Sequence, residues 1–386
     1  MPRRPPSTPP VLPGLSYLRP LGSGGFADVF LYEQDLPRRT VAVKVILADA
    51  IEPEVRRRFA REVDLMARLS AHPSILSIHL ASIAADGRPY LVTEFCPESL
   101  AAEARRGPLP VPRMLDTGVR IAGALETAHR AGVLHRDIKP SNLLVTALGA
   151  PVLADFGIAG LLDAVPGADA DEVVAMSIPW SSPEVLDERT LGTVATEVWS
   201  LGATLWTLLA GRSPFSDPED DRRDRDRMIA RIRQARLGAI PRDDVPEAVE
   251  SVLRRTMARD PSQRQSSMLE LAEQLRWAQV QLGLPTTPVE VGGETWGAVT
   301  VAESADRGPV LPTVRADSRR AVRAAAAVRS AFVGRPSGAA AGRSSAAPGR
   351  RAVLGRRAVL AIAAVAALVV LAVAATVLAV IVGGGR

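Results

Sequence analysis

The octapeptide HRDIKPSN, residues 135–142, interrupts two apolar runs with charged and amide side chains at fixed offsets. It contains Lys139, which is one of only two lysines in a chain with 45 arginines; the other is Lys44, in VAVKV. A planar guanidinium cannot replace a compact ammonium where one point charge must sit against a particular oxygen. The retention of lysine at these two positions therefore indicates contacts with specific oxygen atoms.

Upstream segments predict strands around a glycine turn. Residues 17–34, YLRPLGSGGFADVFLYEQ, predict two strands, and residues 40–48, TVAVKVILA, predict the next one. The glycines at 22, 24 and 25 would let backbone N–H groups face phosphate oxygens. An ordinary glycine hairpin is the alternative.

An amphipathic helix is predicted over residues 53–70, because Phe59, Val63, Met66 and Leu69 share one face. Glu62 lies beside that face. Its carboxylate could hold Lys44 extended toward phosphates, or it could be a solvated helix charge.

These segments, followed by DFG at residues 155–157, resemble the eukaryotic-like Ser/Thr protein kinases of bacteria over residues 15–283. The resemblance implies an α+β, two-lobed protein-kinase fold with a small β-rich N-lobe and a larger helical C-lobe. It also implies transfer of the ATP γ-phosphoryl group to protein Ser/Thr hydroxyls, with ATP and Mg²⁺ as cofactors.

The resemblance assigns roles to individual residues. Asp137 would be the catalytic base, Lys139 would meet the γ-phosphoryl group, and Lys44 would hold the nucleotide phosphates. Asn142 and Asp155 would bind Mg²⁺ through oxygen atoms. The positions expected to bind the nucleotide are Leu21, Gly22, Gly24, Val29, Lys44, Glu62, Glu94, Cys96, Asn142 and Asp155.

Further matches lie in the C-lobe. Ser182-Pro183-Glu184 resembles the family's APE element, and Arg264 resembles the arginine that pairs with its glutamate. VWSLGATLWTLLA, residues 198–210, predicts a long buried helix. Lys139 favours serine or threonine over tyrosine acceptors.

Three residues depart from the family pattern. Ala27 replaces the third loop glycine, Ser177 replaces a threonine near the substrate pocket, and Glu197 stands where an aspartate is usual. The extra methylene of Glu197 could shift His135 and Arg136 by about 1 Å, enough to impair catalysis. A membrane-tethered pseudokinase scaffold that binds nucleotide is therefore the alternative to an active kinase.

The activation segment, residues 160–176, contains no Ser, Thr or Tyr. Phosphorylation within this segment cannot be a switch, so we expect activity without it. Asp169, Asp171 and Glu172 could supply a permanent anion for Arg136, or they could belong to a solvated acidic loop.

The C-terminal end of the chain predicts a membrane tether, and two other segments are expected to be disordered. Residues 1–14 are proline-rich and are expected to be disordered, as are residues 284–357, an Arg/Ala/Pro-rich juxtamembrane linker. Residues 358–382 carry no charge and would span roughly 37 Å as a helix, enough to cross a membrane. Residues 383–386 would form a short external tail.

Charge and composition indicate where in the cell the protein is expected and which partners it is expected to bind. Arginines before the apolar run place the kinase domain in the cytoplasm, as a single-pass protein of the cell membrane. The single cysteine fits a reducing compartment. Among the ten arginines from Arg319 to Arg357 there is a single aromatic residue, Phe332, so no nucleic acid is expected as a partner. A homodimer remains an open alternative.

Overall fold

The computed structural model describes residues 4–24, 27–47, 59, 63–156, 177–216 and 225–292. Glu62, the activation segment 160–176 and the predicted membrane helix 358–382 lie outside the described residues, as does the predicted linker from residue 293 onward. Among the described residues, no helix is both long enough and apolar enough to cross a membrane.

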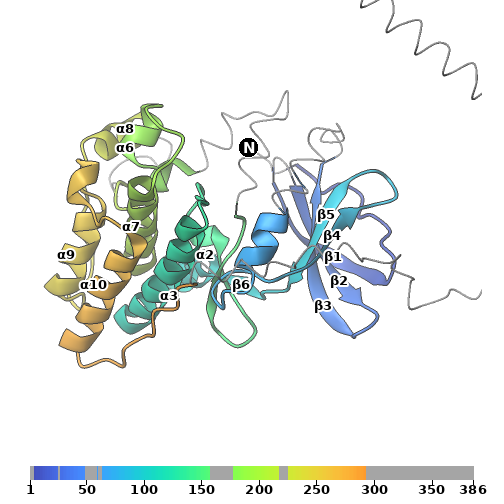
Figure 1. Ribbon diagram of the computed structural model, residues 1–386. Coiled ribbons are helices and arrows are strands. Elements are labelled where there is room, and N and C mark those ends of the chain that lie inside the picture. Colours follow the sequence, from blue (N-terminus) through green and yellow to red (C-terminus); the bar gives the residue numbers. More distant parts are fainter. Residues whose placement is uncertain are drawn as a thin grey trace, which may run out of the picture. The chain divides into compact units, whose positions relative to one another are not determined.

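The N-terminal lobe is built on an antiparallel sheet with the strand order β1-β2-β3-β5-β4 (Figure 1). Its strands are β1 (Leu15–Ser23), β2 (Ala27–Gln34), β3 (Arg39–Ile46), β4 (Ile78–Ile83) and β5 (Pro89–Glu94). Alternate residues of β3 point into the core, where Val41, Val43 and Val45 are fully buried. The strands predicted within residues 17–34 and 40–48 correspond to β1, β2 and β3.

The predicted helix before β4 is partly described. Residues 63–69 are helical, and Phe59 is helical and buried. Leu69 is also buried, and Val63 and Met66 pack partly buried against the core, so the predicted apolar face is the inner one.

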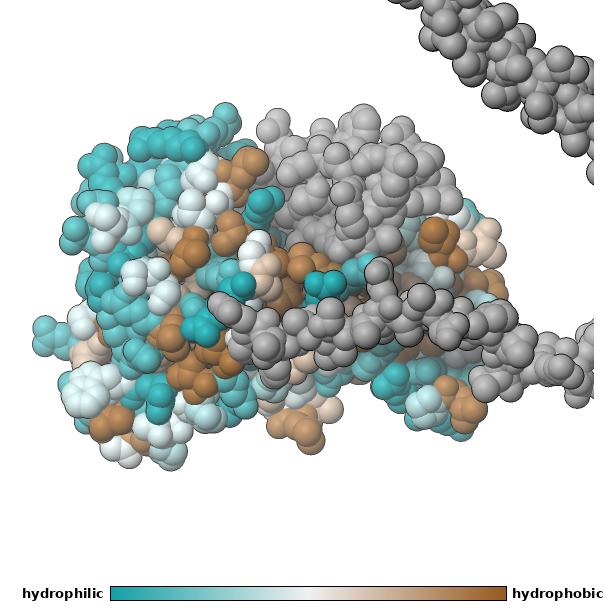
Figure 2. Space-filling view, in the orientation of Figure 1, coloured by the Kyte–Doolittle hydropathy of each residue, from teal (hydrophilic) through white to brown (hydrophobic). Residues whose placement is uncertain are grey.

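The C-terminal lobe is mainly helical. Its helices are α2 (Leu100–Arg106), α3 (Val111–Arg130), α6 (Pro183–Leu186), α7 (Val194–Ala210), α8 (Arg225–Arg233), α9 (Glu247–Thr256) and α10 (Met268–Gln281). The predicted buried helix is α7, in which Trp199 and Trp206 are almost completely enclosed. Figure 2 shows mainly hydrophilic residues along the outer edge of this lobe, where α8 and α9 lie.

Short strands and single-turn 3-10 helices lie between the helices of the C-terminal lobe. The strands β6 (Glu98–Ser99), β7 (Leu143–Val145) and β8 (Pro151–Leu153) form a small antiparallel sheet. The single-turn 3-10 helices are η2 (Pro140–Asn142), η3 (Ile178–Trp180) and η4 (Pro261–Gln263). HRDIKPSN therefore fills the connection between α3 and β7 and ends in η2.

The predicted disorder of residues 1–14 is wrong for residues 4–14, which pack on the sheet. The side chain of Arg4 donates to Asp28 Oδ1 at 2.6 Å, and the Ser7 backbone N–H donates to Asp28 Oδ2 at 2.7 Å. Tyr32 donates its hydroxyl proton to the Pro10 carbonyl at 2.7 Å, and Leu12 is buried in the sheet's core cluster. Buried polar groups on β2 need partners, and this segment supplies them.

The predicted disordered linker also begins too early, because residues 284–292 are ordered. In Figure 1 this segment continues from α10 and runs back along α3. Thr287 is buried there and hydrogen-bonded. The prediction of a linker rested on composition alone. It missed the order of this segment because the contacts that hold it are with residues far away in the sequence, such as Asp116.

Candidate active site

Three side chains contact the carboxylate of Asp137: Lys139 and Asn142 from the loop after α3, and Ser177, the residue before η3. The Lys139 ammonium lies 2.7 Å from Asp137 Oδ2, and Asn142 Nδ2 donates to the same oxygen at 3.0 Å. Ser177 donates to Asp137 Oδ1 at 2.7 Å and accepts from Lys139 Nζ at 3.1 Å. The carboxylate is therefore held by a cation, an amide and a hydroxyl, and it is only partly buried.

A buried carboxylate from α7 fixes the backbone of this loop. Glu197 Oε1 accepts from the Arg136 backbone N–H at 2.6 Å, and its Oε2 lies 2.6 Å from His129 Nε2 at the end of α3. Arg136 has a φ of +66°, a left-handed conformation that costs energy without such support. The side chain of Glu197 thus reaches two groups at once, and the expected shift of His135 and Arg136 stays a prediction.

His135 ties the same loop to the strand that precedes Asp155. Its Nε2 lies 2.8 Å from the Ala154 carbonyl, and its ring packs against Phe156 with centroids 4.6 Å apart. The side chain of His135 is buried. This contact holds the loop that contains Asp137 next to the start of the DFG segment.

Lys44 on β3 pairs with Asp155. The expected pair of Lys44 with Glu62 stays a prediction, because Glu62 lies outside the described residues. The Lys44 Nζ to Asp155 Oδ1 distance is 2.8 Å. Burial raises the pKa of Asp155, but the charge and hydrogen bond of Lys44 outweigh it, so the pKa lies below its ordinary value. Asp155 is therefore ionised, as a ligand for a cation must be.

The glycine-rich turn joins β1 and β2 at the level of Lys44 in the sheet. In the sheet register Gly22 pairs with Val29, and Val29 pairs with Lys44. The backbone N–H of Gly24 donates to the Ala27 carbonyl at 2.9 Å and closes the turn. Leu21 precedes this turn on β1.

The expected hinge follows β5. The Glu94 backbone N–H donates to the Ser77 carbonyl at 3.0 Å, and the Glu94 carbonyl accepts from the Thr93 hydroxyl at 3.2 Å. Cys96 is a free, partly buried thiol, and burial followed by the charge of Glu94 raises its pKa to about 12. A neutral thiol is a poor nucleophile, so the raised pKa argues against a reactive thiol, and the expected contact of Cys96 with the nucleotide stays a prediction.

Asn142 and Asp155 fit the donor set that Mg²⁺ prefers. Asn142 uses its amide nitrogen to donate to the Asp137 carbonyl at 2.8 Å, so its Oδ1 remains an acceptor. Asn142 thus offers an amide oxygen and Asp155 an ionised carboxylate oxygen, and both are hard oxygen ligands. They would hold the metal between the catalytic loop and the residue that Lys44 contacts.

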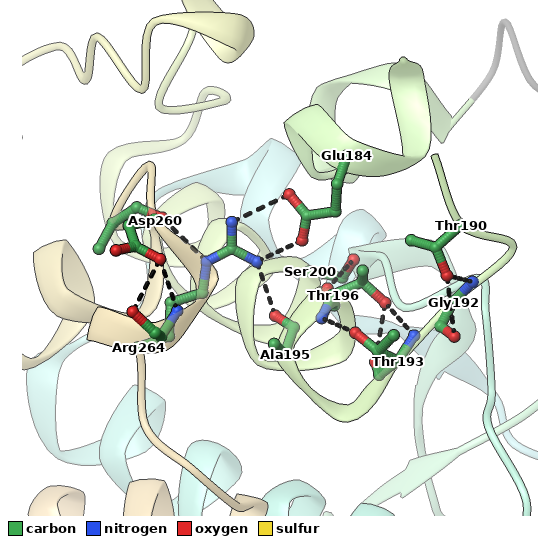
Figure 3. A network of polar contacts seen from close by, with 11 residues as sticks. Glu184, Thr190, Gly192, Thr193, Ala195, Thr196, Ser200, Asp260 and Arg264 are labelled. Carbon is green, nitrogen blue, oxygen red and sulfur yellow. Dashed lines mark hydrogen bonds and ion pairs between the residues drawn. The ribbon is translucent and has the colours of Figure 1, made fainter. Parts of the chain in front are cut away.

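An ion pair joins α6 to the end of η4 in the C-lobe (Figure 3). Arg264 donates through Nη1 and Nη2 to the two oxygens of Glu184, at 2.6 and 3.0 Å, and also to the Ala195 carbonyl at 2.9 Å. The guanidinium also stacks over the Trp199 ring at 4.8 Å. This is the pair expected from the resemblance between Ser182-Pro183-Glu184 and the APE element, and its forked geometry explains the arginine.

The family model for the protein kinase domain matches residues 15–277. The chain belongs to the protein kinase family. The kinase domain therefore contains the cluster around Asp137, the Lys44–Asp155 pair and the Glu184–Arg264 pair.

Curated protein kinases resemble the same region. The chain is 38% identical over 290 residues to the serine/threonine-protein kinase PknK of Mycobacterium tuberculosis, covering 73% of this chain and 25% of that protein. It is 32% identical over 276 residues to PknF of the same species, covering 68% and 56%, and 32% identical over 266 residues to PrkC of Bacillus subtilis, covering 68% and 40%. The chain thus spans a quarter of the length of its PknK relative.

Two contacts of the kinase active site were not foreseen. His129 was not singled out as the partner of Glu197, because 68 residues separate them in the sequence. Thr204 on α7 donates to the Ile138 carbonyl at 3.3 Å. Its hydroxyl group within the apolar run 198–210 was a signal for a buried polar contact, but the run contains other hydroxyl residues and the sequence does not tell them apart.

Proposed function

We propose that this chain is a membrane-anchored serine/threonine protein kinase that transfers the γ-phosphoryl group of ATP to protein hydroxyls. The observation that carries the proposal is the state of Asp137. Its carboxylate faces a serine hydroxyl at 2.7 Å and an ammonium at 2.7 Å, which are the two groups that phosphoryl transfer needs around a base.

Asp137 would act on the acceptor hydroxyl. The contact from Ser177 is a hydroxyl-to-carboxylate hydrogen bond of the kind that a substrate serine or threonine would make. As the acceptor oxygen forms its bond to the γ-phosphorus, the bond between that phosphorus and the bridging oxygen breaks, and ADP leaves. The hydroxyl proton passes to Asp137.

Lys139 and Lys44 would meet the phosphate charge. Lys139 Nζ lies close enough to both Asp137 and Ser177 to contact the group being transferred. Lys44, on β3 beside the glycine turn, would turn from Asp155 toward the nucleotide phosphates. Mg²⁺, held by Asn142 and Asp155 with phosphate oxygens, would neutralise charge that develops on those oxygens.

The pseudokinase alternative rested on Glu197. Its bond to the Arg136 backbone supplies the support that the strained loop residue requires, so this departure from the family pattern gives little reason to expect lost turnover. We therefore favour the hypothesis that the protein is an active kinase.

Phosphate transfer from labelled Mg²⁺·ATP to the chain itself and to a generic basic protein tests the proposal, with Lys44→Met and Asp137→Asn as matched variants. We expect label on serine or threonine that disappears in both variants. Bound ATP without transfer by the unaltered chain would instead establish the nucleotide-binding scaffold.

We propose further that residues 358–382 anchor the chain in the cell membrane, with the kinase domain in the cytoplasm. The support is the charge-free composition of that run and the four arginines at 350, 351, 356 and 357 before it. Truncation after residue 357 should move the protein from the alkali-resistant membrane fraction to the supernatant. Unchanged sedimentation of the truncated chain would refute the anchor.

A further inference from the structure

Residues 284–292, which we call the C-terminal strap, follow α10 and lie beyond the residues matched to the kinase family. Thr287 fastens the beginning of the strap. Its backbone N–H donates to Gln279 Oε1 at 2.9 Å, and its hydroxyl accepts from Gln279 Nε2 and donates to Asp116 on α3 at 3.0 Å. Both groups of Thr287 are therefore paired, and the residue is buried.

The end of the strap lies directly on α3. A Cβ atom at Gly123 would be 2.4 Å from the Glu290 carbonyl oxygen, so only glycine allows this approach. One turn further along, Thr127 Oγ1 accepts from the Gly292 backbone N–H at 2.9 Å while donating to the Gly123 carbonyl. The surface of α3 is thus shaped to receive this piece of backbone.

The strap also contacts His72, in the loop that leads to β4. His72 Nε2 lies 2.8 Å from the Glu290 carbonyl, and the Ser74 backbone N–H donates to His72 Nδ1 at 3.0 Å. Because Nδ1 accepts, the ring proton is on Nε2 and points to the strap. His72 is 1% exposed, and its two nitrogens connect the strap to the Ser74 backbone.

From Ser74 the connection continues to the proposed magnesium ligands. The Leu153 backbone N–H donates to the Ser74 carbonyl at 2.9 Å, and the Leu153 carbonyl accepts from Leu76 at 2.9 Å. Asp155 follows two residues later. Ala154, between them, donates to the Asn142 carbonyl at 2.9 Å, so one short strand connects His72 to both ligands.

We propose that the C-terminal strap is a positioning element of the active site, which holds Asn142 and Asp155 in place through His72 and β8. The inference rests on the proposed function for the role of those two residues. It makes the affinity for magnesium-bound nucleotide depend on a segment that touches neither the nucleotide nor the metal.

Gly123→Ala in the full-length chain tests the proposal, because the added methyl displaces the strap while alanine suits a helix better than glycine. Gly107→Ala is the matched control, since a Cβ there meets open space and the backbone is extended. Hydrogen exchange of residues 285–292 reports the strap. Binding of a non-hydrolysable ATP analogue with and without Mg²⁺ reports the ligands without requiring turnover.

We expect Gly123→Ala to lose protection in the strap and to bind the analogue about two- to thirtyfold more weakly with Mg²⁺, the range of coupling that such networks carry. Binding without Mg²⁺ should stay unchanged, and Gly107→Ala should match the unaltered chain. The double variant with His72→Asn should be no weaker than the worse single variant, because both interrupt one connection.

Two results would overturn the proposal: a strap that stays protected in Gly123→Ala, or a released strap with unchanged Mg²⁺-dependent binding. A chain that binds Mg²⁺·nucleotide in the expected strap-dependent way but never transfers phosphate would contradict the proposed function alone. The two ideas can therefore fail separately.

Discussion

Lys139 and Lys44 retain an ammonium in a chain whose other basic side chains, the histidines aside, are all arginines. Each of the two makes a contact with one carboxylate oxygen, at 2.7 and 2.8 Å. Lys139 additionally donates to a hydroxyl, within a space bounded by Asp137 and Ser177. A forked, planar group would need two parallel acceptors, as Arg264 has on Glu184.

Lys139→Arg should lower kcat about 10- to 100-fold, because the wider head group displaces Asp137 from the acceptor hydroxyl. The KM for ATP should change little, since Lys44 and the glycine turn are untouched. Steady-state phosphorylation of a generic protein substrate measures both constants. Arg130→Lys, at a partly exposed pair with Glu126, is the control and should have no effect.

Glu197 is the second residue whose side chain can be varied informatively. Glu197→Ala leaves both the Arg136 N–H and His129 Nε2 without their acceptor, and we expect kcat to fall about 100-fold from loss of loop position. Glu197→Gln keeps an acceptor for Arg136 and should retain most of the activity. Equal losses in the two variants would show that charge, and not the backbone hydrogen bond, matters.

Among the elements, α7 depends most on its ends and on close packing. Thr193 and Thr196 form a reciprocal capping box at its start, with contacts of 3.2 and 2.9 Å (Figure 3). At Gly202 an added Cβ would lie 1.7 Å from the Thr256 hydroxyl of α9. The helix that carries Glu197 is therefore fixed at its first turn and along one side.

Thr193→Ala should lower the free energy of unfolding by about 0.5–2 kcal/mol, because the first turn of α7 loses a cap. Urea unfolding followed by tryptophan fluorescence would measure the change, since Trp199 and Trp206 lie in the same helix. Ser251→Ala, at an exposed site in α9, should remain within about 0.5 kcal/mol. A shift at Ser251 as large as that at Thr193 would contradict a capping role.

Helices and strands whose apolar residues form a clear pattern within one segment were predictable from the sequence. Residues 40–48 and 198–210 were predicted as a strand and as a long buried helix, and they form β3 and α7. The family resemblance carried by HRDIKPSN indicated that Asp137, Lys139 and Asn142 belong to one site. The strap was not predictable in this way, because Thr287 pairs with Asp116, 171 positions earlier. Proline-rich composition argued for disorder there and at residues 4–14, and long-range pairing overrode it.

For the folded unit as a whole, His72 connects parts of the chain that are distant in sequence, and burial gives it a pH-dependent effect. Burial lowers the pKa of His72 below 6.5, only partly opposed by the Glu290 carbonyl. Below 6.5 the unfolded chain binds this proton while the folded one does not. The free energy of unfolding therefore falls as the pH decreases toward the lowered pKa, and is fully retained above 6.5.

His72→Asn should remove this part of the pH dependence, because asparagine accepts from Ser74 without titrating. The urea midpoint of both proteins, measured from about pH 7.5 to about pH 5.5, gives the comparison. His79, whose pKa burial also lowers, is present in both and cancels. Parallel curves for the two proteins would show that His72 does not contribute.

The contacts of residues 4–14 determine which fragments of this kinase can be produced intact. A fragment beginning at Leu15, where the family match begins, would lose both donors to the Asp28 carboxylate and leave the place of Leu12 in the sheet's core empty. Loss of a buried leucine side chain alone costs about 2–5 kcal/mol. Fragments for crystallisation or inhibitor screening should therefore begin before Arg4.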